Sequence, residues 1–373
     1  MIKYLDLQCI NARHEPHLTE AVQRVVASGR YLHGPEVKAF ETAFADRCGG
    51  GYCVGVANGL DALTLILLSL KEMHGWDDGD EVIVPAMTFF ATGLAVVRAG
   101  LHPVFCDVDP TTYLMDIQDA EQKINLHTRV LLPVHLYGRM ANMSELDEFA
   151  RHYGLHIVED AAQAHGASDS EGNHPGQMSI AAAFSFYPGK NLGAMGDGGA
   201  VVTRDENLAE IVRTFANYGA EEKYVHQCFG INSRLDEVQA SVLNVKLPHL
   251  DAENALRRHQ AALYAKHIRE SALTLPYGGE VPDGSVFHIY PLLVPCPETM
   301  QKQLLEMGVE TLRHYPLPLH HQPAFENVWN GEIYPMSEYI AAHELSLPIG
   351  PHLTDDEIVR VAESVVHAYR ETI

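Results

Sequence analysis

Residues 184–193 read Phe-Ser-Phe-Tyr-Pro-Gly-Lys-Asn-Leu-Gly, and residues 158–163 read Val-Glu-Asp-Ala-Ala-Gln. Each stretch overlaps the end of a short apolar run of the kind that forms a buried strand, and each continues into small and polar residues. Lys190 follows Ser185 by five positions and Asp160 by thirty. Ligands of open α/β sheets bind at the carboxyl ends of the strands, so we look for the chemistry of this chain at these three residues.

The chain around these stretches alternates short apolar runs with helix-like segments from about residue 53 to residue 203. Such alternation is typical of βαβ units, so we predict an α/β fold with a mostly parallel, seven-stranded sheet. The seven runs lie at residues 52–56, 81–84, 103–107, 130–136, 156–159, 182–186 and 200–203.

The C-terminal third has a different pattern. Its predicted elements are helices at 233–248, 250–266 and 298–307 and strands at 286–294 and 309–312. Thr354 is a predicted N-cap, because three acidic residues follow it and an amphipathic helix can continue to about Tyr369. We therefore predict a large domain at residues 1–248 and a smaller α+β domain at residues 249–373.

Composition excludes several classes of protein. A formal charge of −23 opposes binding to nucleic acid, whose affinity depends on neutralising phosphates. The apolar runs are far shorter than the ~20 residues of a membrane span. The six cysteines form no Cys-x-x-Cys pair, so we predict neither a disulfide framework nor a metal site. The N-terminus has no signal-peptide pattern, which leads us to expect a cytoplasmic protein.

The carboxylate, lysine and serine suit a pyridine cofactor that carries a phosphate. Asp160 would pair with the protonated ring nitrogen and keep the ring an electron acceptor. Gln163, placed one helical turn later, would reach the ring hydroxyl. Lys190 would hold the cofactor covalently and, once displaced, would move a proton between the substrate and the cofactor.

The phosphate needs donors of its own. Ser185 and the backbone of Gly59 and Leu60, which precede a helix predicted at 62–70, would hold the phosphate at that helix's N-terminus. Phe89 follows another predicted strand, where an aromatic face would stack on the cofactor ring.

Each of these residues also has a commoner structural explanation. Asp160 alone would be a helix N-cap, Lys190 a surface lysine and Phe89 a core aromatic, while Gly59 fits an ordinary strand-to-helix turn. The order and spacing of the whole set favour the cofactor site.

Nine stretches from one end of the chain to the other resemble a known family. They are Leu-Asp-Leu at 5–7, Ser-Gly-Arg-Tyr-Leu-His-Gly at 28–34, Val-Ala-Asn-Gly-Leu-Asp-Ala-Leu at 56–63, Asp-Val-Asp-Pro at 107–110, Val-His-Leu-Tyr-Gly at 134–138, Glu-Asp-Ala-Ala-Gln-Ala-His-Gly at 159–166, the stretch at 184–193, Asn-Ser-Arg-Leu-Asp-Glu-Val-Gln-Ala at 232–240 and Leu-Ser-Leu-Pro at 345–348. This set is similar to the DegT/DnrJ/EryC1/StrS sugar aminotransferases, which have the aspartate-aminotransferase fold (fold type I).

The resemblance implies pyridoxal 5'-phosphate as cofactor, pyridoxamine 5'-phosphate in the half-reaction, and Lys190 as the Schiff-base lysine. It also implies a homodimer with active sites at the subunit interface, where Asn232 would reach the phosphate of the neighbouring subunit's cofactor. Many members have Thr where this chain has Leu60, so one hydroxyl donor to the phosphate is lost or replaced here. Members with His in place of the Schiff-base lysine are dehydratases, so Lys190 favours transamination.

The subgroup that the chain resembles aminates dTDP-3-keto-6-deoxyhexoses, with glutamate as the expected amino donor. This resemblance implies that the sugar is bound by Tyr187, Arg234, His314, Tyr315 and His320. The histidines have a plain alternative as solvated loop residues.

Three other functions remain open at this point. The nearest is amination of a 4-keto-6-deoxysugar, and the others are a sugar dehydratase and a regulatory protein without catalysis.

Overall fold

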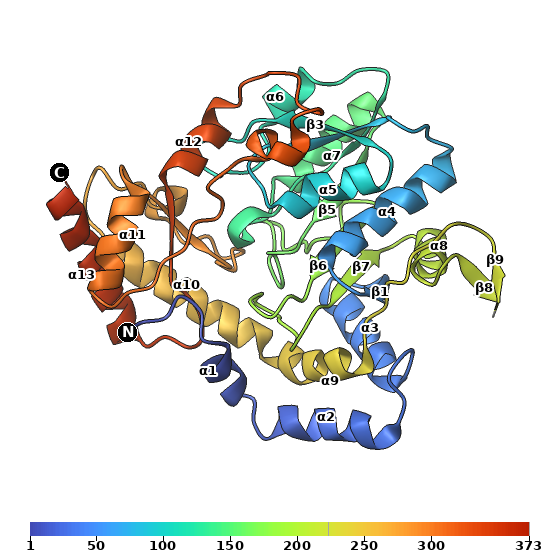
Figure 1. Ribbon diagram of the computed structural model, residues 1–373, viewed down its shortest axis with the longest axis horizontal. Helices are drawn as coiled ribbons and strands as arrows, with labels where there is room; N and C mark the ends of the chain where they lie inside the picture. Colours follow the sequence, from blue (N-terminus) through green and yellow to red (C-terminus); the bar gives the residue numbers. More distant parts are fainter. Residues whose placement is uncertain (223, 373) are drawn as a thin grey trace.

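The computed structural model describes residues 1–222 and 224–372 of this 373-residue chain. A seven-stranded sheet in the order β1-β7-β6-β5-β4-β2-β3 forms its centre (Figure 1). The strands are β1 (Tyr52–Val56), β2 (Glu81–Pro85), β3 (His102–Cys106), β4 (Thr128–Leu131), β5 (His156–Asp160), β6 (Ala181–Ser185) and β7 (Gly199–Thr203). Only β7 runs antiparallel to its neighbours within this sheet. The predicted α/β class and mostly parallel sheet are confirmed.

All seven predicted runs form strands, with one clear difference in length. The prediction continued β4 to residue 136, whereas the strand ends at Leu131. Pro133 has no N–H to extend the ladder, and a 3₁₀ turn follows at Leu136–Gly138.

Helices cover both faces of the sheet. One core cluster joins the strands to α4 (Gly59–His74), α5 (Phe90–Arg98) and α8 (Glu206–Ala216), and another joins them to α3 (Pro35–Arg47), α7 (Met143–Tyr153) and α9 (Glu237–Lys246). Strand β1 contributes side chains to both core clusters, because alternate side chains of a strand point to opposite faces of the sheet. Cys53 belongs to the cluster with α3, and Val54 belongs to the cluster with α4. The same part of the chain also contains α1 (Leu7–Ala12), α2 (His17–Ser28) and α6 (Ile117–Glu121).

A third core cluster lies beyond the sheet. It contains residues of α10 (Leu250–His267), α11 (Pro297–Glu306), α13 (Asp355–Thr372), β10 (Tyr290–Leu293) and β11 (Glu344–Leu347). The helices predicted at 250–266, 298–307 and from Thr354 are present, and Thr354 accepts a hydrogen bond from the Glu357 N–H as expected of an N-cap. The helix predicted at 233–248 begins only at Glu237.

Two strand predictions in this region were wrong in extent. The segment 286–294 is extended only over β10, because Phe287 has a positive φ of 39° that interrupts a strand. The segment 309–312 forms no ladder, because its two ends pair with different partners. Val309 bridges to Ile2, and Leu312 bridges to Ser346.

The chain crosses between the two regions more than once. Ile2 packs in the third cluster, whereas Leu319, Phe325 and Tyr334 pack with α4 and α5. In Figure 1, α12 (Pro335–His343) correspondingly lies near α6, apart from α13. The domain boundary between residues 248 and 249 stays a prediction. Among the described residues, no helix is long and apolar enough to span a membrane.

Candidate functional site

The predicted site residues follow strands whose carboxyl ends share one edge of the sheet. Strands β2, β5 and β6 belong to one parallel run, and β1 has the same direction because β7 is antiparallel to both β1 and β6. Gly59, Phe89 and Lys190 come after β1, β2 and β6 respectively, and Asp160 is the last residue of β5. The sheet therefore gathers residues that are up to 131 positions apart in the sequence.

The loop that carries Lys190 is closed and firmly anchored. A Cβ at Gly193 would lie 2.3 Å from the Pro188 carbonyl oxygen, so only glycine allows this close return of the backbone. Asn191 ties the loop to α10, because its Nδ2 donates to Asn254 Oδ1 and to the Val286 carbonyl, both at 2.9 Å. The lysine thus extends from a rigid support.

Lys190 and Asp160 form the electrostatic centre of the site. Burial lowers the pKa of Lys190 to about 8, while the charge of Asp160 opposes this change. Asp160 is 6% exposed, and burial raises the pKa of its carboxyl although Thr92 Oγ1 donates to it at 2.8 Å and the Ala162 N–H at 3.1 Å. A cationic ring nitrogen would stabilise the ionised form of this buried carboxyl.

The backbone from Asp160 to Gln163 forms turns, whereas we predicted one helical turn between these two residues. Residues 161–167 contain two turns because the Asp160 side chain bonds the Ala162 N–H and the chain then bends away. Gln163 Oε1 accepts the Tyr137 N–H at 2.6 Å, and Gln163 Nε2 donates to the Tyr315 hydroxyl at 3.1 Å. The Tyr315 ring lies 5.4 Å from the half-exposed ring of Phe89.

The first turn of α4 supplies the donors for a phosphate. Asn58 caps this helix by accepting the Asp61 N–H at 2.8 Å. Within the part of the chain that the structure describes, the N–H groups of Gly59 and Leu60 make no hydrogen bond to protein. A Cβ at Gly59 would lie 2.7 Å from Ser185 Cβ, so glycine lets the helix start pack directly on the serine. Free N–H groups beside a hydroxyl suit an anion.

These donors fit a phosphorylated pyridine. A buried carboxylate is available for a ring nitrogen, free N–H groups and a serine for a phosphate, and an amine of lowered pKa for an aldehyde.

Comparison with known proteins agrees with this assignment. The sequence matches the DegT/DnrJ/EryC1/StrS aminotransferase family over residues 13–366. The chain belongs to this family. It is 45% identical to the dTDP-3-amino-3,6-dideoxy-alpha-D-galactopyranose transaminase of Aneurinibacillus thermoaerophilus, over 98% of this chain and 99% of that one. It is 47% identical to the erythromycin biosynthesis sensory transduction protein EryC1 of Saccharopolyspora erythraea, over 95% of each chain.

Solved structures of family members match the fold closely. The structure of DesV from S. venezuelae in complex with a ketimine intermediate superposes with a TM-score of 0.93, at 44% identity and 98% coverage of both chains. The structure of ntda from Bacillus subtilis with bound cofactor pmp gives a TM-score of 0.90 at 30% identity, over 98% of this chain and 85% of that one. The aminotransferases of this family depend on pyridoxal phosphate. The predictions of fold type I and of the cofactor are confirmed.

The family site in this chain includes a buried network that the sequence analysis missed. Glu344 accepts the His314 N–H at 2.6 Å and also the Ser346 hydroxyl, while His314 Nδ1 lies 2.8 Å from Ser346 Oγ. Because the serine hydroxyl donates to Glu344, His314 Nδ1 donates to the serine, which leaves Nε2 as an acceptor. Burial lowers the pKa of His314 to about 4, so its ring is neutral at neutral pH.

The signal for this network was a glutamate and a serine inside an otherwise apolar strand. All four residues of β11 are buried, and Glu344 has no exposed surface. Burial raises the pKa of Glu344 to about 7. A charged side chain in such a strand is uncommon, and it needs polar partners on a neighbouring segment.

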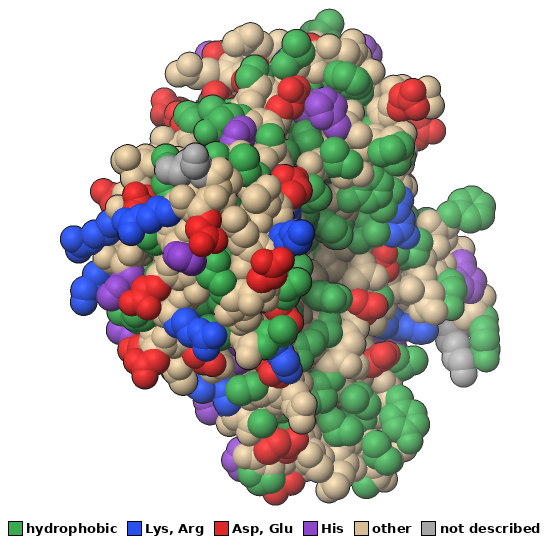
Figure 2. Space-filling view, turned by 60° about the vertical axis from the view of Figure 1, so that its left-hand side comes forward, with side chains coloured by type: hydrophobic (Ala, Val, Ile, Leu, Met, Phe, Trp, Pro, Cys, Tyr) green, Lys and Arg blue, Asp and Glu red, His purple; other side chains and the backbone are tan. Residues whose placement is uncertain are grey.

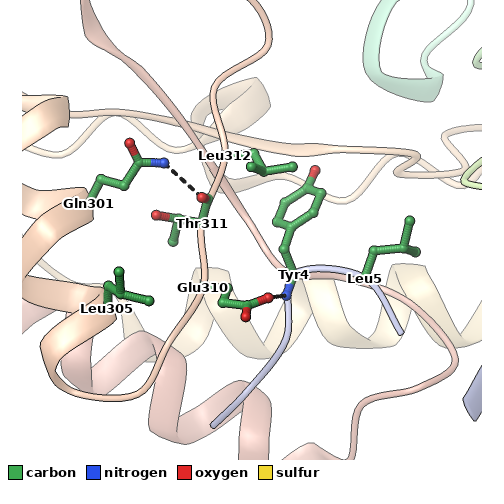
Figure 3. A pocket seen from close by; sticks show the side chains of 7 residues that line it. All are labelled: Tyr4, Leu5, Gln301, Leu305, Glu310, Thr311 and Leu312. Carbon is green, nitrogen blue, oxygen red and sulfur yellow. Dashed lines mark hydrogen bonds between the residues drawn. The ribbon is translucent and has the colours of Figure 1, made fainter. Parts of the chain in front are cut away.

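Tyr4 connects the N-terminal segment to His314. The two rings stack with centroids 5.7 Å apart. Tyr4 and Leu5 also line a pocket of about 350 Å³ beside α11, in which Glu310 Oε2 accepts the Tyr4 N–H and Gln301 donates to the Thr311 carbonyl (Figure 3).

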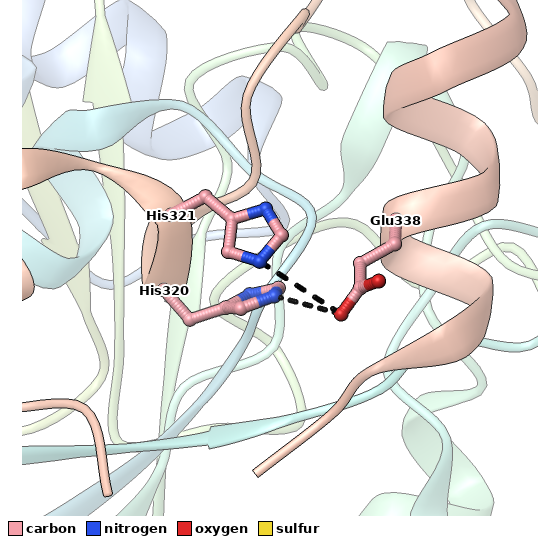
Figure 4. Close-up of side chains that lie close together, drawn as sticks. All are labelled: His320, His321 and Glu338. Atoms are coloured by element: carbon pink, nitrogen blue, oxygen red, sulfur yellow. Dashed lines mark hydrogen bonds and ion pairs between the residues drawn. The ribbon is translucent and has the colours of Figure 1, made fainter. Parts of the chain in front are cut away.

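His320 lies in a different environment from the other predicted sugar residues. Its ring is 1% exposed, and its Nε2 lies 3.2 Å from Glu338 Oε1 on α12 (Figure 4). Burial lowers its pKa. The rings of Trp329 and Tyr334 pack against it at 5.6 and 4.7 Å. None of these described contacts involves Lys190 or Tyr315, and the sugar-binding role of His320 stays a prediction.

The remaining predicted residues are accessible. Tyr187 is 58% exposed and lies three residues before Lys190. Asn232 is exposed, and Arg234 extends over the Tyr218 ring at 5.8 Å. Ser233, between them, accepts the Ala57 N–H at 3.0 Å, which places this segment beside the end of β1. The structure thus leaves Tyr187, Asn232 and Arg234 free to meet a ligand or a second subunit.

Proposed function

We propose that this enzyme transfers an amino group to C3 of a dTDP-linked 3-keto-6-deoxyhexose, which yields the 3-amino-3,6-dideoxyhexose, with glutamate as donor. The observation that carries this proposal is Lys190 facing a buried Asp160 in a chain 45% identical to a transaminase named for a dTDP-3-amino-3,6-dideoxy sugar. The position of the amine in that relative's name favours C3 over C4.

Each proposed site residue has its own role in the reaction. Bound pyridoxal phosphate supplies the electron sink and carries the amino group between the two half-reactions. Asp160 keeps the ring nitrogen protonated, Gln163 and Phe89 position the ring, and Ser185 with the Gly59 and Leu60 N–H groups holds the phosphate.

Lys190 is the catalytic residue. With a pKa lowered to about 8, roughly a tenth of the amine is neutral at pH 7, far more than for an ordinary lysine, so the amine can attack an aldehyde and later accept a proton from the substrate's α carbon. The same site serves both the donor and the sugar, so the kinetics are expected to be ping-pong.

The sugar would meet groups on the open side of this site. Tyr187 offers an exposed hydroxyl, and neutral His314 offers an acceptor at Nε2, next to Tyr315. Arg234 would bind an anionic part of the substrate. His320 was also predicted to bind the sugar, but it is 1% exposed and its ring contacts Glu338 instead.

We further propose a homodimer with active sites shared between subunits. The hairpin of β8 (Ala220–Glu222) and β9 (Val225–His226) projects from the body, and some hydrophobic side chains are exposed on the projection at the right of Figure 2. Phe229 is fully exposed and Tyr218 is 48% exposed. Burying one such ring contributes roughly 2 kcal/mol, which supports a subunit contact here. Exposed Asn232 would then reach the partner's cofactor phosphate.

A mixing experiment tests the shared site. Lys190→Ala and Asn232→Ala variants should each be nearly inactive, and their mixture should regain partial activity because one site of each mixed dimer has both residues. If the mixture stays inactive although mixed dimers form, the shared site is wrong.

The location and partners are part of the proposal. We propose a cytoplasmic enzyme with a nucleotide sugar and an amino acid as its ligands and no membrane partner. Its charge of −23 opposes a nucleic-acid partner. The sugar product would enter an O-antigen, S-layer or antibiotic glycan.

The decisive experiment is product analysis. Holoenzyme with glutamate should convert dTDP-3-keto-6-deoxyhexoses and not their 4-keto isomers, and NMR should place the amine on C3. An amine on C4 would replace this proposal with the 4-aminotransferase alternative. No turnover of any keto-sugar would favour a regulatory role of the kind named for the EryC1 relative.

Lys190→Ala supplies the internal control. The variant should bind pyridoxamine phosphate yet show no turnover. A dehydratase would need no covalent lysine link, so borohydride fixation of cofactor on Lys190 in the wild type would exclude it.

A further inference from the structure

Three potential metal ligands converge at the side of the large sheet, outside the cofactor site. His320 and His321 are consecutive residues of a 3₁₀ turn (Leu319–His321), and Glu338 faces them from α12 (Figure 4). One ligand atom of each lies within 4.8 Å of the other two. Glu338 Oε1 is 3.2 Å from His320 Nε2 and 3.9 Å from His321 Nε2.

A single His–Glu hydrogen bond accounts for only part of this arrangement. It explains the approach of His320 to Glu338, but not a second imidazole directed at the same oxygen. His320 Nδ1 is buried and has no hydrogen-bond partner within the described residues. Without an ion, His320 Nε2 donates to the Glu338 carboxylate; when an ion takes the place of that proton, the ring proton can reside on Nδ1 while Nε2 presents a lone pair.

The surroundings make the cluster both rigid and accessible. His320 is held by Trp329 and Tyr334, and its ring centroid is 4.1 Å from that of His321. The side chains of His321 and Glu338 are 39% and 34% exposed, so an ion and its water can enter from solvent. Buried His320 is thus held rigidly, whereas the partly exposed side chains of His321 and Glu338 can adjust to an ion.

We propose that His320, His321 and Glu338 bind a divalent cation of the zinc class, with water completing the coordination. Two imidazoles and one carboxylate form a common zinc-binding set. Bonds of about 2.0–2.1 Å in a tetrahedron place ligand atoms roughly 3.3 Å apart. The 3.2 Å pair already meets this spacing, and a rotation of partly exposed His321 shortens the 3.9 Å separation.

This site is independent of cysteine, whose spacing led us to predict no metal. Its effect would be structural. The ion would fasten the 3₁₀ turn to α12, and this turn lies four residues after Tyr315. The ion would therefore steady the segment that contributes His314 and Tyr315 to the cofactor site.

Zinc titration of tag-free holoenzyme tests the proposal. The protein is first dialysed against a chelator, and Zn²⁺ is then added in competition with a chromophoric indicator. The variants are His321→Ala and Glu338→Gln, both at partly exposed positions. The control is His367→Ala, which breaks a 3.2 Å exposed pair with Glu371 and leaves the other histidines and the cofactor unchanged.

The wild type and His367→Ala should bind one Zn²⁺ alike, and each test variant should bind at least about tenfold more weakly, since even loss of an outer-shell partner costs 10–100-fold. Zn²⁺ should also raise the Tm of the wild type and not of His321→Ala. Equal zinc affinity in the wild type and His321→Ala overturns the proposal, because binding would then occur at other histidines or at the cofactor.

Discussion

Gln163 and Tyr315 join the middle and the C-terminal part of the chain at the proposed cofactor site: the amide of Gln163 donates to the Tyr315 hydroxyl at 3.1 Å across 152 residues. The other end of the same amide accepts the Tyr137 N–H. Gln163 therefore has both polar atoms fixed, and the loop that carries Tyr315 is held against the large sheet.

Tyr315→Phe removes only the acceptor in this pair. The loss of one buried hydrogen bond costs about 1 kcal/mol, so we expect kcat/KM for the sugar to fall about fivefold. Steady-state kinetics measure this, with Tyr339→Phe on α12 as the control. An unchanged kcat/KM would show that the contact does not support the site.

Asp160→Asn keeps the shape of the buried carboxylate and removes its charge. The Thr92 hydroxyl can still donate to the amide oxygen, but the ring nitrogen loses its anionic partner. We expect kcat to fall at least about 100-fold while cofactor remains bound, as seen by its absorbance. Thr92→Val, which removes one donor and leaves the charge, should cost far less. Near-normal activity of Asp160→Asn would contradict the proposed pairing.

Gly59→Ala tests the phosphate end of the site. The new Cβ would lie 2.7 Å from Ser185 Cβ, so the start of α4 or the serine must move. Overpacking of this kind costs about 1–3 kcal/mol, and we expect pyridoxal phosphate affinity to fall at least about fivefold. Equilibrium dialysis measures it. Wild-type affinity would show that the Gly59 and Leu60 N–H groups do not hold the phosphate.

The sequence was sufficient for the sheet, because each strand is a local apolar run, and it allowed Asp160, Ser185 and Lys190 to be proposed as site residues, because they end or follow those runs. It could not supply partners that are distant in sequence. Thr92, Tyr137 and Glu344 meet the site only through the fold. Local turns also escaped the prediction: the carboxylate of Asp160 accepts the Ala162 N–H and redirects the chain where we predicted one helical turn.

The pH dependence of cofactor capture follows from Lys190. Only the neutral amine attacks an aldehyde, and burial lowers the pKa of Lys190 to about 8. The rate at which apoenzyme captures pyridoxal phosphate should therefore rise with pH through a midpoint near 8 and level off about one pH unit above it. Asp160 raises this pKa, so Asp160→Asn should shift the midpoint to lower pH. Stopped-flow absorbance follows both, and a rate that still climbs near pH 10 would contradict the lowered pKa.

Glu344 makes the stability of the enzyme depend on pH. Burial raises its pKa to about 7 from the ordinary 4.5, so the folded chain binds more protons than the unfolded chain between these values. Its stabilising contribution is complete below about pH 4.5 and is lost as the pH rises through 7. The loss amounts to roughly 3 kcal/mol at most.

Glu344→Gln removes this titration and keeps an oxygen to accept the His314 N–H. Relative to the wild type, the variant should therefore gain free energy of unfolding as the pH rises from about 5 to about 8, as urea denaturation can measure. Glu363→Gln, at an exposed position of α13, is the control, and the pH-dependent gain should be confined to Glu344→Gln. A difference between wild type and Glu344→Gln that stays constant across this range would show that Glu344 remains ionised in the fold, and that His314 is held by a permanent anion instead of a titrating carboxyl.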